Sequence, residues 1–127
     1  MKQIDQTYSI KAPIDKVWQA LTDAKLGEQW GAGPAAFDLK EGGEFSYWGG
    51  DIHGTNTKIV ANKLLEQDWY GEDRPEHCYK VSFELNEVGG ATTVHLIHAD
   101  VPDEEAEDFE EGWKDFYFDP IKELLET

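Results

Sequence analysis

The sequence predicts an α+β fold in which a curved antiparallel sheet wraps around a long C-terminal helix. Three observations carry this prediction. A helical pattern follows the first strand directly, alternating strands fill the middle of the chain, and helical spacing of apolar residues runs from Asp103 to the end. Because 127 residues with 39% apolar content suit one compact core, we expect a single domain spanning residues 1–127.

The N-terminal elements are predicted to be a strand and a helix. Residues 2–11 alternate apolar and polar side chains, and the Ala12-Pro13 step then ends the strand. Proline suits a first helical position, and apolar side chains follow with helical spacing. They are Ile14, Val17, Trp18 and Leu21. The Thr22-Asp23 pair and Gly27 then predict a break, after which a loop begins near Trp30.

Turn signals divide the centre of the chain into strands. The predicted strands are the segment with Phe37 and Leu39, then residues 44–48, 52–61 and 63–71. Adjacent glycines accept positive φ, so Gly42-Gly43 and Gly89-Gly90 predict hairpin turns. The second of these turns joins the clearest alternating strands. Their inward positions are Tyr79, Val81, Phe83 and Leu85 before the turn and Thr92, Val94, Leu96 and His98 after it.

A long helix is predicted to close the chain. Its apolar residues are Phe109, Trp113, Phe116, Tyr117, Ile121, Leu124 and Leu125. Carboxylates crowd its first turns, where the helix dipole is positive. Pro120 removes one backbone hydrogen bond and clashes with the carbonyl four residues earlier. We therefore expect a kink near Phe116, with open space beneath the helix.

Composition and charge limit the kinds of partner that the protein is expected to bind. The formal net charge of −16 would repel nucleic acid and anionic membrane surfaces, so we expect neither as a partner of this acidic protein. The N-terminal residues lack the apolar run of a signal peptide, and no stretch is long and apolar enough to span a membrane. We expect a cytoplasmic protein. The lone cysteine, Cys78, can form no disulfide within the chain.

Catalytic and metal patterns are weak. The four histidines are too scattered for a zinc site, and no phosphate-binding loop or Ser-His-Asp order is present. We expect no metal and no cofactor. His95 and His98 should lie on opposite faces of one strand. His98 would point inward, either as an ordinary core residue, as a hydrogen-bonding partner of a ligand, or as a base near neutral pH.

Aromatic residues suggest a pocket between sheet and helix. Their large apolar area and polar tips suit an apolar ligand, although the same side chains also suit an ordinary core. The candidate ligand-binding residues are Trp30, Tyr47, Trp69, Tyr79, His98, Trp113, Phe116 and Tyr117.

Several motifs support a family resemblance. The segment APIDKVWQALTD at 12–23 looks like an opening Pro-x-x-x-Val-Trp-x-Ala-Leu helix, and Gly42, Gly43 and Phe45 look like a GG-x-F hairpin. The string EGWKDFYFDPIKELL at 111–125 is similar to a Gly-Trp-x-x-aromatic-Tyr-Phe-x-x-Ile-Lys pattern. On these motifs the chain resembles, over nearly its whole length, the C-terminal domain of the activator of the ninety-kilodalton heat-shock chaperone ATPase. This family belongs to the START-like, or SRPBCC, helix-grip superfamily, which also includes pollen allergens.

The resemblance implies a non-catalytic binding module that acts in the stress response. Its implied partners are a small apolar ligand in a cavity between sheet and helix, or a heat-shock chaperone, with the chain acting as a monomer or homodimer. Other superfamily members close polyketide rings or hydrolyse small esters. The alternative function is therefore a small enzyme with His98 as general base and Tyr79 as hydrogen-bond donor.

Overall fold

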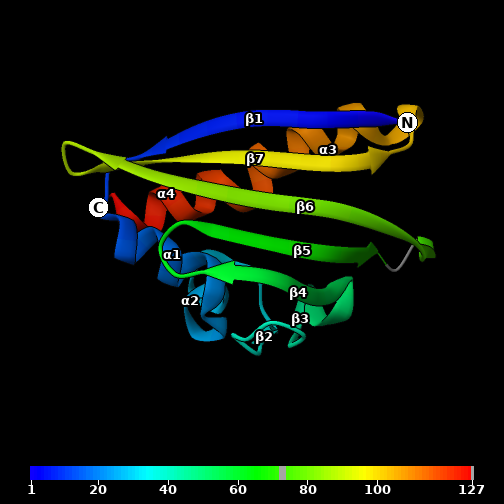
Figure 1. Cartoon of the computed structure of the whole chain (residues 1–127), viewed down its shortest axis with the longest axis horizontal. Coiled ribbons are helices and arrows are strands. Elements are labelled where there is room, and N and C mark those ends of the chain that lie inside the picture. The colour runs from blue at the N-terminus through cyan, green and yellow to red at the C-terminus, as the bar shows by residue number, and fades with distance from the viewer. Residues whose placement is uncertain (72–73, 127) are drawn as a thin grey trace.

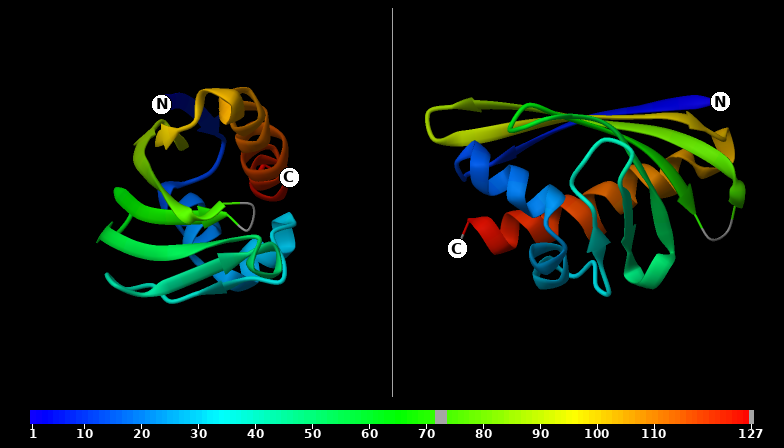
Figure 2. Two further views of the ribbon diagram at one scale, coloured as in Figure 1. Left: turned by 90° about the vertical axis from the view of Figure 1, so that its right-hand side faces the viewer. Right: turned by 60° about the horizontal axis from the view of Figure 1, so that its bottom comes forward.

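A curved antiparallel sheet forms the centre of the molecule in this computed structural model, which describes residues 1–71 and 74–126. The strand order within the described residues is β1-β7-β6-β5-β4-β3-β2. The strands are β1 (Lys2–Ile10), β2 (Ala36–Phe37), β3 (Glu44–Tyr47), β4 (Ile52–Val60), β5 (Leu64–Gly71), β6 (Arg74–Val88) and β7 (Ala91–Val101). Figure 1 and Figure 2 show the sheet curving around the C-terminal helix, which confirms the predicted fold class.

Helices occupy the concave side of the sheet (Figure 1). Two short helices, α1 (Ile14–Thr22) and α2 (Ala24–Trp30), connect β1 to β2. A 3-10 turn, η1 (Trp48–Gly50), links β3 to β4. The C-terminal helical run consists of the 3-10 turn η2 (Asp103–Glu105), α3 (Ala106–Gly112), the π-helical segment η3 (Trp113–Phe118) and α4 (Asp119–Leu125). Residue 127, which the predicted helix included, lies outside the described residues.

The segment after α1 differs from the prediction. Pro13 is the N-cap of α1 rather than its first helical residue. A second helix replaces the predicted break, because the Asp23 side chain accepts a hydrogen bond from the Lys25 amide at 2.8 Å and caps a new helix start. Gly27 is buried inside this helix, where an added Cβ would lie 3.3 Å from the Tyr47 ring. Tight packing therefore explains a glycine that suggested a break.

The C-terminal helical run adjusts to Pro120 by changing its hydrogen-bond pattern. Pro120 lies in the first turn of α4, directly after the π-helical segment η3. Such segments often lie at functional sites. The sequence predicted a kink near Phe116, and the structure has η3 at that place. Within η3, Trp113 and Tyr117 are buried, whereas the Phe116 side chain is 69% exposed.

The core fills the space between the concave face of the sheet and the C-terminal helical run. Alternate residues of the long strands point into it, as the period of two requires. Aromatic pairs join helix to sheet: Phe118 stacks on Tyr8 with ring centroids 4.1 Å apart, and Tyr117 stacks on Phe83 at 5.8 Å. This packing fixes the face of the helix that borders the candidate site.

Candidate ligand-binding site

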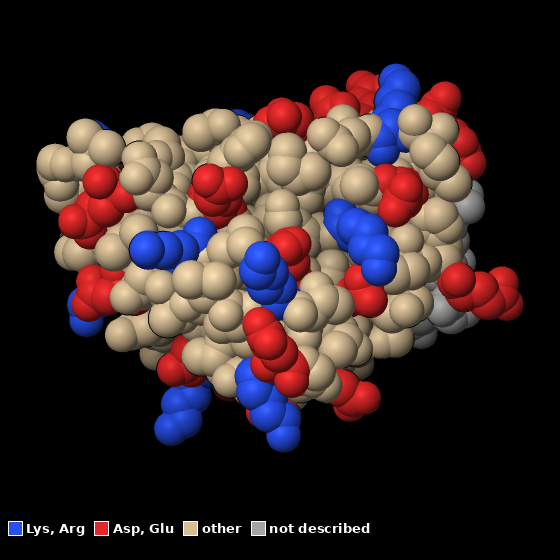
Figure 3. Space-filling model, in the orientation of Figure 1, with Lys and Arg blue, Asp and Glu red and all other residues tan. Residues whose placement is uncertain are grey.

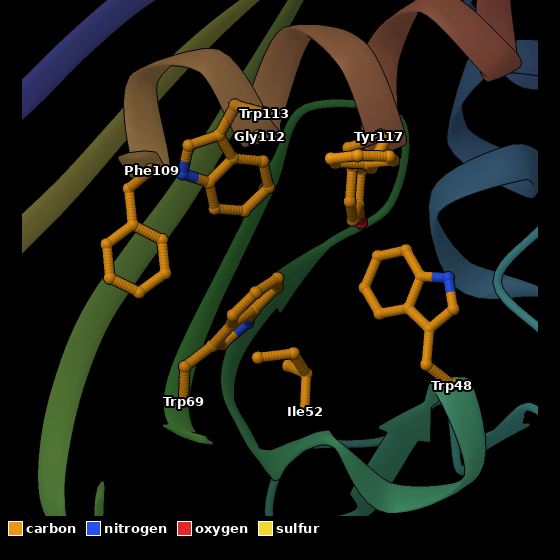
Figure 4. Close-up of a pocket in the computed structure, with 8 residues that line it drawn as sticks. Trp48, Ile52, Trp69, Phe109, Gly112, Trp113 and Tyr117 are labelled. Atoms are coloured by element: carbon orange, nitrogen blue, oxygen red, sulfur yellow. The ribbon is translucent and has the colours of Figure 1, made fainter. Parts of the chain in front are cut away.

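An apolar pocket of about 240 Å³ lies between the C-terminal helical run and the segment formed by η1, β4 and β5. Figure 4 shows its side chains converging from these elements, with Trp48 and Phe109 at opposite ends. The lining residues are Trp48, Ile52, Trp69, Phe109, Gly112, Trp113, Phe116 and Tyr117. The pocket therefore lies beneath the helix, where the sequence predicted open space.

Half of the candidate residues from the sequence line this pocket. They are Trp69, Trp113, Phe116 and Tyr117. The others lie outside the lining: Trp30, Tyr47, Tyr79 and His98. Trp30 and Tyr47 pack against Tyr117, with ring centroids 4.8 Å and 6.3 Å from it. They therefore support a lining residue without facing the pocket.

Several lining residues were not among the sequence candidates. They are Trp48, Ile52, Phe109 and Gly112. Phe109 precedes Trp113 by four residues, so the helical spacing that selected Trp113 also pointed to Phe109. Trp48 continued a strand pattern in the sequence, and its apolar spacing did not indicate the turn that directs its ring into the pocket. The adjacent glycines Gly49-Gly50 could have indicated that turn, since they are the same signal as Gly42-Gly43.

Trp113 is held by a buried histidine. Its indole Nε1 donates a hydrogen bond to Nδ1 of His98 at 2.9 Å, and His98 is fully buried. Burial and, to a smaller extent, the nearby His77 together lower the pKa of His98 to about 3. An indole N–H can only donate, so Nδ1 must stay unprotonated to accept this bond. Nε2 has no hydrogen-bond partner among the described residues.

The geometry does not favour His98 as a general base. A base must reach the proton that it removes, yet His98 is fully buried and is absent from the pocket lining. The Tyr79 hydroxyl, the proposed hydrogen-bond donor, donates to Oε1 of Glu105 at 2.6 Å. Both groups thus have structural partners that join the sheet to the C-terminal helical run.

Trp69 is held by a chain of buried amides. Its Nε1 donates to Oε1 of Gln67 at 2.6 Å, and Nε2 of Gln67 donates to Oδ1 of Asn56 at 2.8 Å. Nδ2 of Asn56 then donates to the carbonyl of Asp38 at 2.9 Å. Gln67 and Asn56 are at most 2% exposed, so each link satisfies a group that would be costly to leave unpaired. Sequence reasoning did not identify this network.

A glycine lies opposite Trp69 in the sheet. Gly54 of β4 pairs with Trp69 of β5, and a Cβ on Gly54 would lie 1.8 Å from the carbonyl oxygen of Asp68. No side chain fits at that distance from a backbone atom. Gly54 therefore allows the two strands to approach closely where Trp69 enters the pocket.

Trp48 adopts an unfavourable backbone conformation at the edge of the pocket. Its φ is +53°, in the left-handed region that bulky residues avoid, and two glycines with positive φ follow it. Its indole Nε1 donates to the carbonyl of Gly31 at 2.9 Å, and its ring packs edge-on against Trp30. Such strain costs of order 1–3 kcal/mol and clusters at ligand sites.

Tyr117 completes the lining with a hydroxyl that is also engaged. Burial raises the pKa of Tyr117 well above its ordinary value, and the nearby Tyr47, to which its hydroxyl is hydrogen-bonded, raises it further. The Tyr47 hydroxyl in turn donates to the carbonyl of Leu21 at 3.1 Å. Every indole N–H and the phenol hydroxyl of the lining therefore already has a protein partner, which leaves ring faces and apolar groups for a ligand.

Within residues 1–71 and 74–126, no three His, Cys, Asp or Glu side chains are arranged to hold a metal ion. None of the helices in these same ranges has the length and apolar character needed to cross a membrane.

A curved sheet closed by a C-terminal helix over an apolar pocket defines the helix-grip class of proteins. The family model described as "Activator of Hsp90 ATPase homolog 1-like protein" matches residues 11–126. The chain therefore belongs to this family.

Curated relatives agree with the family. The activator of 90 kDa heat shock protein ATPase homolog 2 from Mus musculus is 29% identical over 115 residues, which cover 89% of this chain and 34% of the relative. An uncharacterized protein from Schizosaccharomyces pombe is 27% identical over 123 residues, which cover 96% of this chain and 37% of the relative. The chain thus spans about a third of the length of these relatives.

Solved structures show the same fold. An HSP90 activator from Plasmodium falciparum has a TM-score of 0.89 at 26% identity, covering 99% of this chain and 97% of that chain. CalU16 from Micromonospora echinospora has a TM-score of 0.83 at 27% identity, with 96% and 73% covered. An Aha1 dimer from Colwellia psychrerythraea has a TM-score of 0.82 at 26% identity, with 100% and 98% covered.

Proposed function

We propose that this chain is a non-catalytic binding module that holds a small apolar molecule in the pocket beneath its C-terminal helix. The observation that carries the proposal is the lining itself: aromatic rings surround a space of about 240 Å³, and their polar atoms are all engaged by the protein. Small-molecule sites are concave and mostly apolar, as this pocket is. The engaged positions of His98 and Tyr79 weigh against the enzymatic alternative.

The test fills the pocket without removing a contact. Gly112 is in the lining, and an added Cβ there meets nothing within 4 Å. Gly112→Leu should therefore occupy the space while the helix is kept, since leucine is a better helix former than glycine. Glu107→Leu adds the same side chain at an exposed position of α3 outside the lining and serves as the matched control.

Native mass spectrometry of protein purified from its own host measures the outcome. The wild type and the Glu107→Leu variant should retain the same small molecule, and the Gly112→Leu variant should lose it. The same spectra report whether the chain is a monomer or a homodimer. A molecule retained equally by all three proteins would place its binding elsewhere and contradict the proposal.

A heat-shock chaperone is the second proposed partner. The observation that favours it is the likeness to the HSP90 activator from Plasmodium falciparum, which extends over nearly all of both chains. Isothermal titration of this chain against the 90 kDa chaperone of its host should show saturable binding. The Gly112→Leu variant in the same titration would separate the two activities, because binding that survives pocket filling uses another surface.

A further inference from the structure

The geometry points to a cationic ligand: the pocket selects a small organic molecule that carries an alkylated ammonium group. This inference rests on the proposed function, because it names the chemical class of the ligand for the same pocket.

The first step concerns hydrogen bonds. The indole N–H groups of Trp48, Trp69 and Trp113 donate to Gly31, Gln67 and His98. The Tyr117 hydroxyl is engaged with Tyr47. An anion or a ligand rich in hydroxyl groups would lose its hydration here without gaining partners from these side chains. The same holds for a primary ammonium, which needs acceptors for three N–H groups. An ammonium whose hydrogens are replaced by alkyl groups has no such requirement.

The second step concerns the ring faces. The rings of Trp69, Trp113 and Tyr117 form one cluster, with centroids 4.9 Å apart for the first two, 4.9 Å for the last two and 6.3 Å for the outer pair. Trp48 lies across the pocket from Phe109 (Figure 4). Aromatic faces are electron-rich and attract a cation within about 6 Å of the ring centroid, tryptophan most strongly. Rings on several sides therefore favour a cation over a neutral molecule of equal shape.

The third step concerns the charge beside the pocket. Each of five exposed carboxylates among the described residues is next in the chain to a lining residue: Asp51, Asp108, Glu110, Glu111 and Asp115. The one lysine in such a position among the described residues, Lys114, lies 2.9 Å from a carboxylate oxygen of Asp119 and 3.7 Å from one of Asp115. On the outer face of the sheet, by contrast, lysines are interspersed with acidic residues (Figure 3). The electrostatic potential beside the pocket is therefore negative. It has the same sign as the net charge of −16, and both attract cations.

The test compares two molecules of one shape. Benzyltrimethylammonium and neopentylbenzene differ in having a charged nitrogen or a neutral carbon at the same position. Competition binding followed by tryptophan fluorescence should show that the ammonium compound binds at least ~10-fold more tightly than neopentylbenzene. The reason is that only the ammonium compound gains the cation–π attraction of the rings. Phenylacetate, the anionic probe, should not compete. Sodium chloride should weaken binding of the ammonium compound and leave that of the neutral compound unchanged.

Variants locate the preference in the rings. Trp48→Leu and Phe116→Leu keep apolar volume but remove an aromatic face, so each should reduce ammonium affinity several-fold more than the affinity for neopentylbenzene. Phe116 is 69% exposed, which makes folding of its variant secure. Phe37→Leu, at a half-buried ring outside the lining, is the control and should change neither affinity.

The outcomes separate this inference from the proposed function. Equal affinity for the charged and neutral compounds would overturn the cation inference while leaving an apolar binding module. Failure of both compounds to bind, together with no retained molecule in the native mass spectrum, would overturn both.

Discussion

The backbone conformation of Trp48 is held by contacts around the pocket and not by the local preference of the chain. A bulky side chain at φ +53° opposes the local preference of the chain, whereas glycine would adopt this conformation without strain. The surrounding contacts with Gly31 and Trp30 hold the residue in place. An observed outlier of this kind at the edge of a pocket supports a role in binding.

Two substitutions at Trp48 should reverse the usual order of stability. Alanine removes the ring but keeps Cβ at positive φ, whereas glycine removes both. We expect Trp48→Gly to be about 1 kcal/mol more stable than Trp48→Ala, because left-handed conformations cost roughly 1–2 kcal/mol for residues with a Cβ. Urea unfolding of the two variants measures the difference in the free energy of unfolding. A more stable alanine variant would show that the backbone at position 48 carries no strain.

At the scale of elements, the pairing of β4 with β5 depends on Gly54. This residue allows the close approach at Trp69, where a Cβ would overlap the Asp68 carbonyl oxygen. Since the obstacle is backbone, no side-chain rotation can relieve it.

Gly54→Ala should therefore be strongly destabilising, by ~3 kcal/mol or more, because the strands must separate next to a buried tryptophan. Gly112→Ala is the control: its Cβ meets nothing, and the helix should gain roughly 0.5–1 kcal/mol. Thermal unfolding monitored by circular dichroism gives both values. Similar melting temperatures for the two variants would contradict the close approach of the strands.

The elements were predicted with uneven success for identifiable reasons. Alternation of apolar residues located the hairpin of β6 and β7, because that pattern has one structural solution on a half-buried sheet. Pro120 marked where the C-terminal helix is interrupted, but a missing N–H does not say whether a kink or a π-helical segment results. The second helix was missed because the reason for Gly27 is a contact with Tyr47, twenty positions away.

The same limit applied to the candidate site. Residues on the helix, such as Trp113 and Tyr117, were found from their spacing alone. Trp48 and Ile52 enter the pocket only because a turn directs them there, and that turn is not encoded in a hydrophobic period. His98 was correctly predicted to point inward, yet its role as acceptor for Trp113 depends on a contact between sheet and helix.

Two opposing effects of pH act on the molecule as a whole. Lowering the pH protonates carboxylates and reduces the self-repulsion of a chain with net charge −16. Buried His98 acts in the other direction. Its pKa is about 3 in the folded protein and 6.5 when exposed, so between these values the unfolded chain binds the extra proton. The contribution of His98 to stability is complete above pH 6.5 and is lost as the pH falls toward 3.

This contribution can be isolated with His98→Asn, whose amide oxygen can accept the Trp113 hydrogen bond but does not titrate. Between pH 6 and pH 5 the wild type should lose about 1 kcal/mol more of its free energy of unfolding than the variant does. Urea unfolding at the two pH values gives the comparison, in which the carboxylate effects common to both proteins cancel. Equal losses would mean that His98 is protonated in the folded protein.

Because each pocket indole is hydrogen-bonded to a different part of the protein, the three indole N–H groups report separately on local opening of the structure. Trp69 is bonded within β5, Trp113 bridges helix to sheet, and Trp48 joins η1 to the loop after α2. Each indole hydrogen exchanges with solvent deuterium only when its own bond breaks. Their separate exchange rates therefore distinguish fraying of the sheet, lifting of the helix and movement of the Trp48 turn. The indole hydrogen that exchanges fastest would identify the element that opens to admit a ligand.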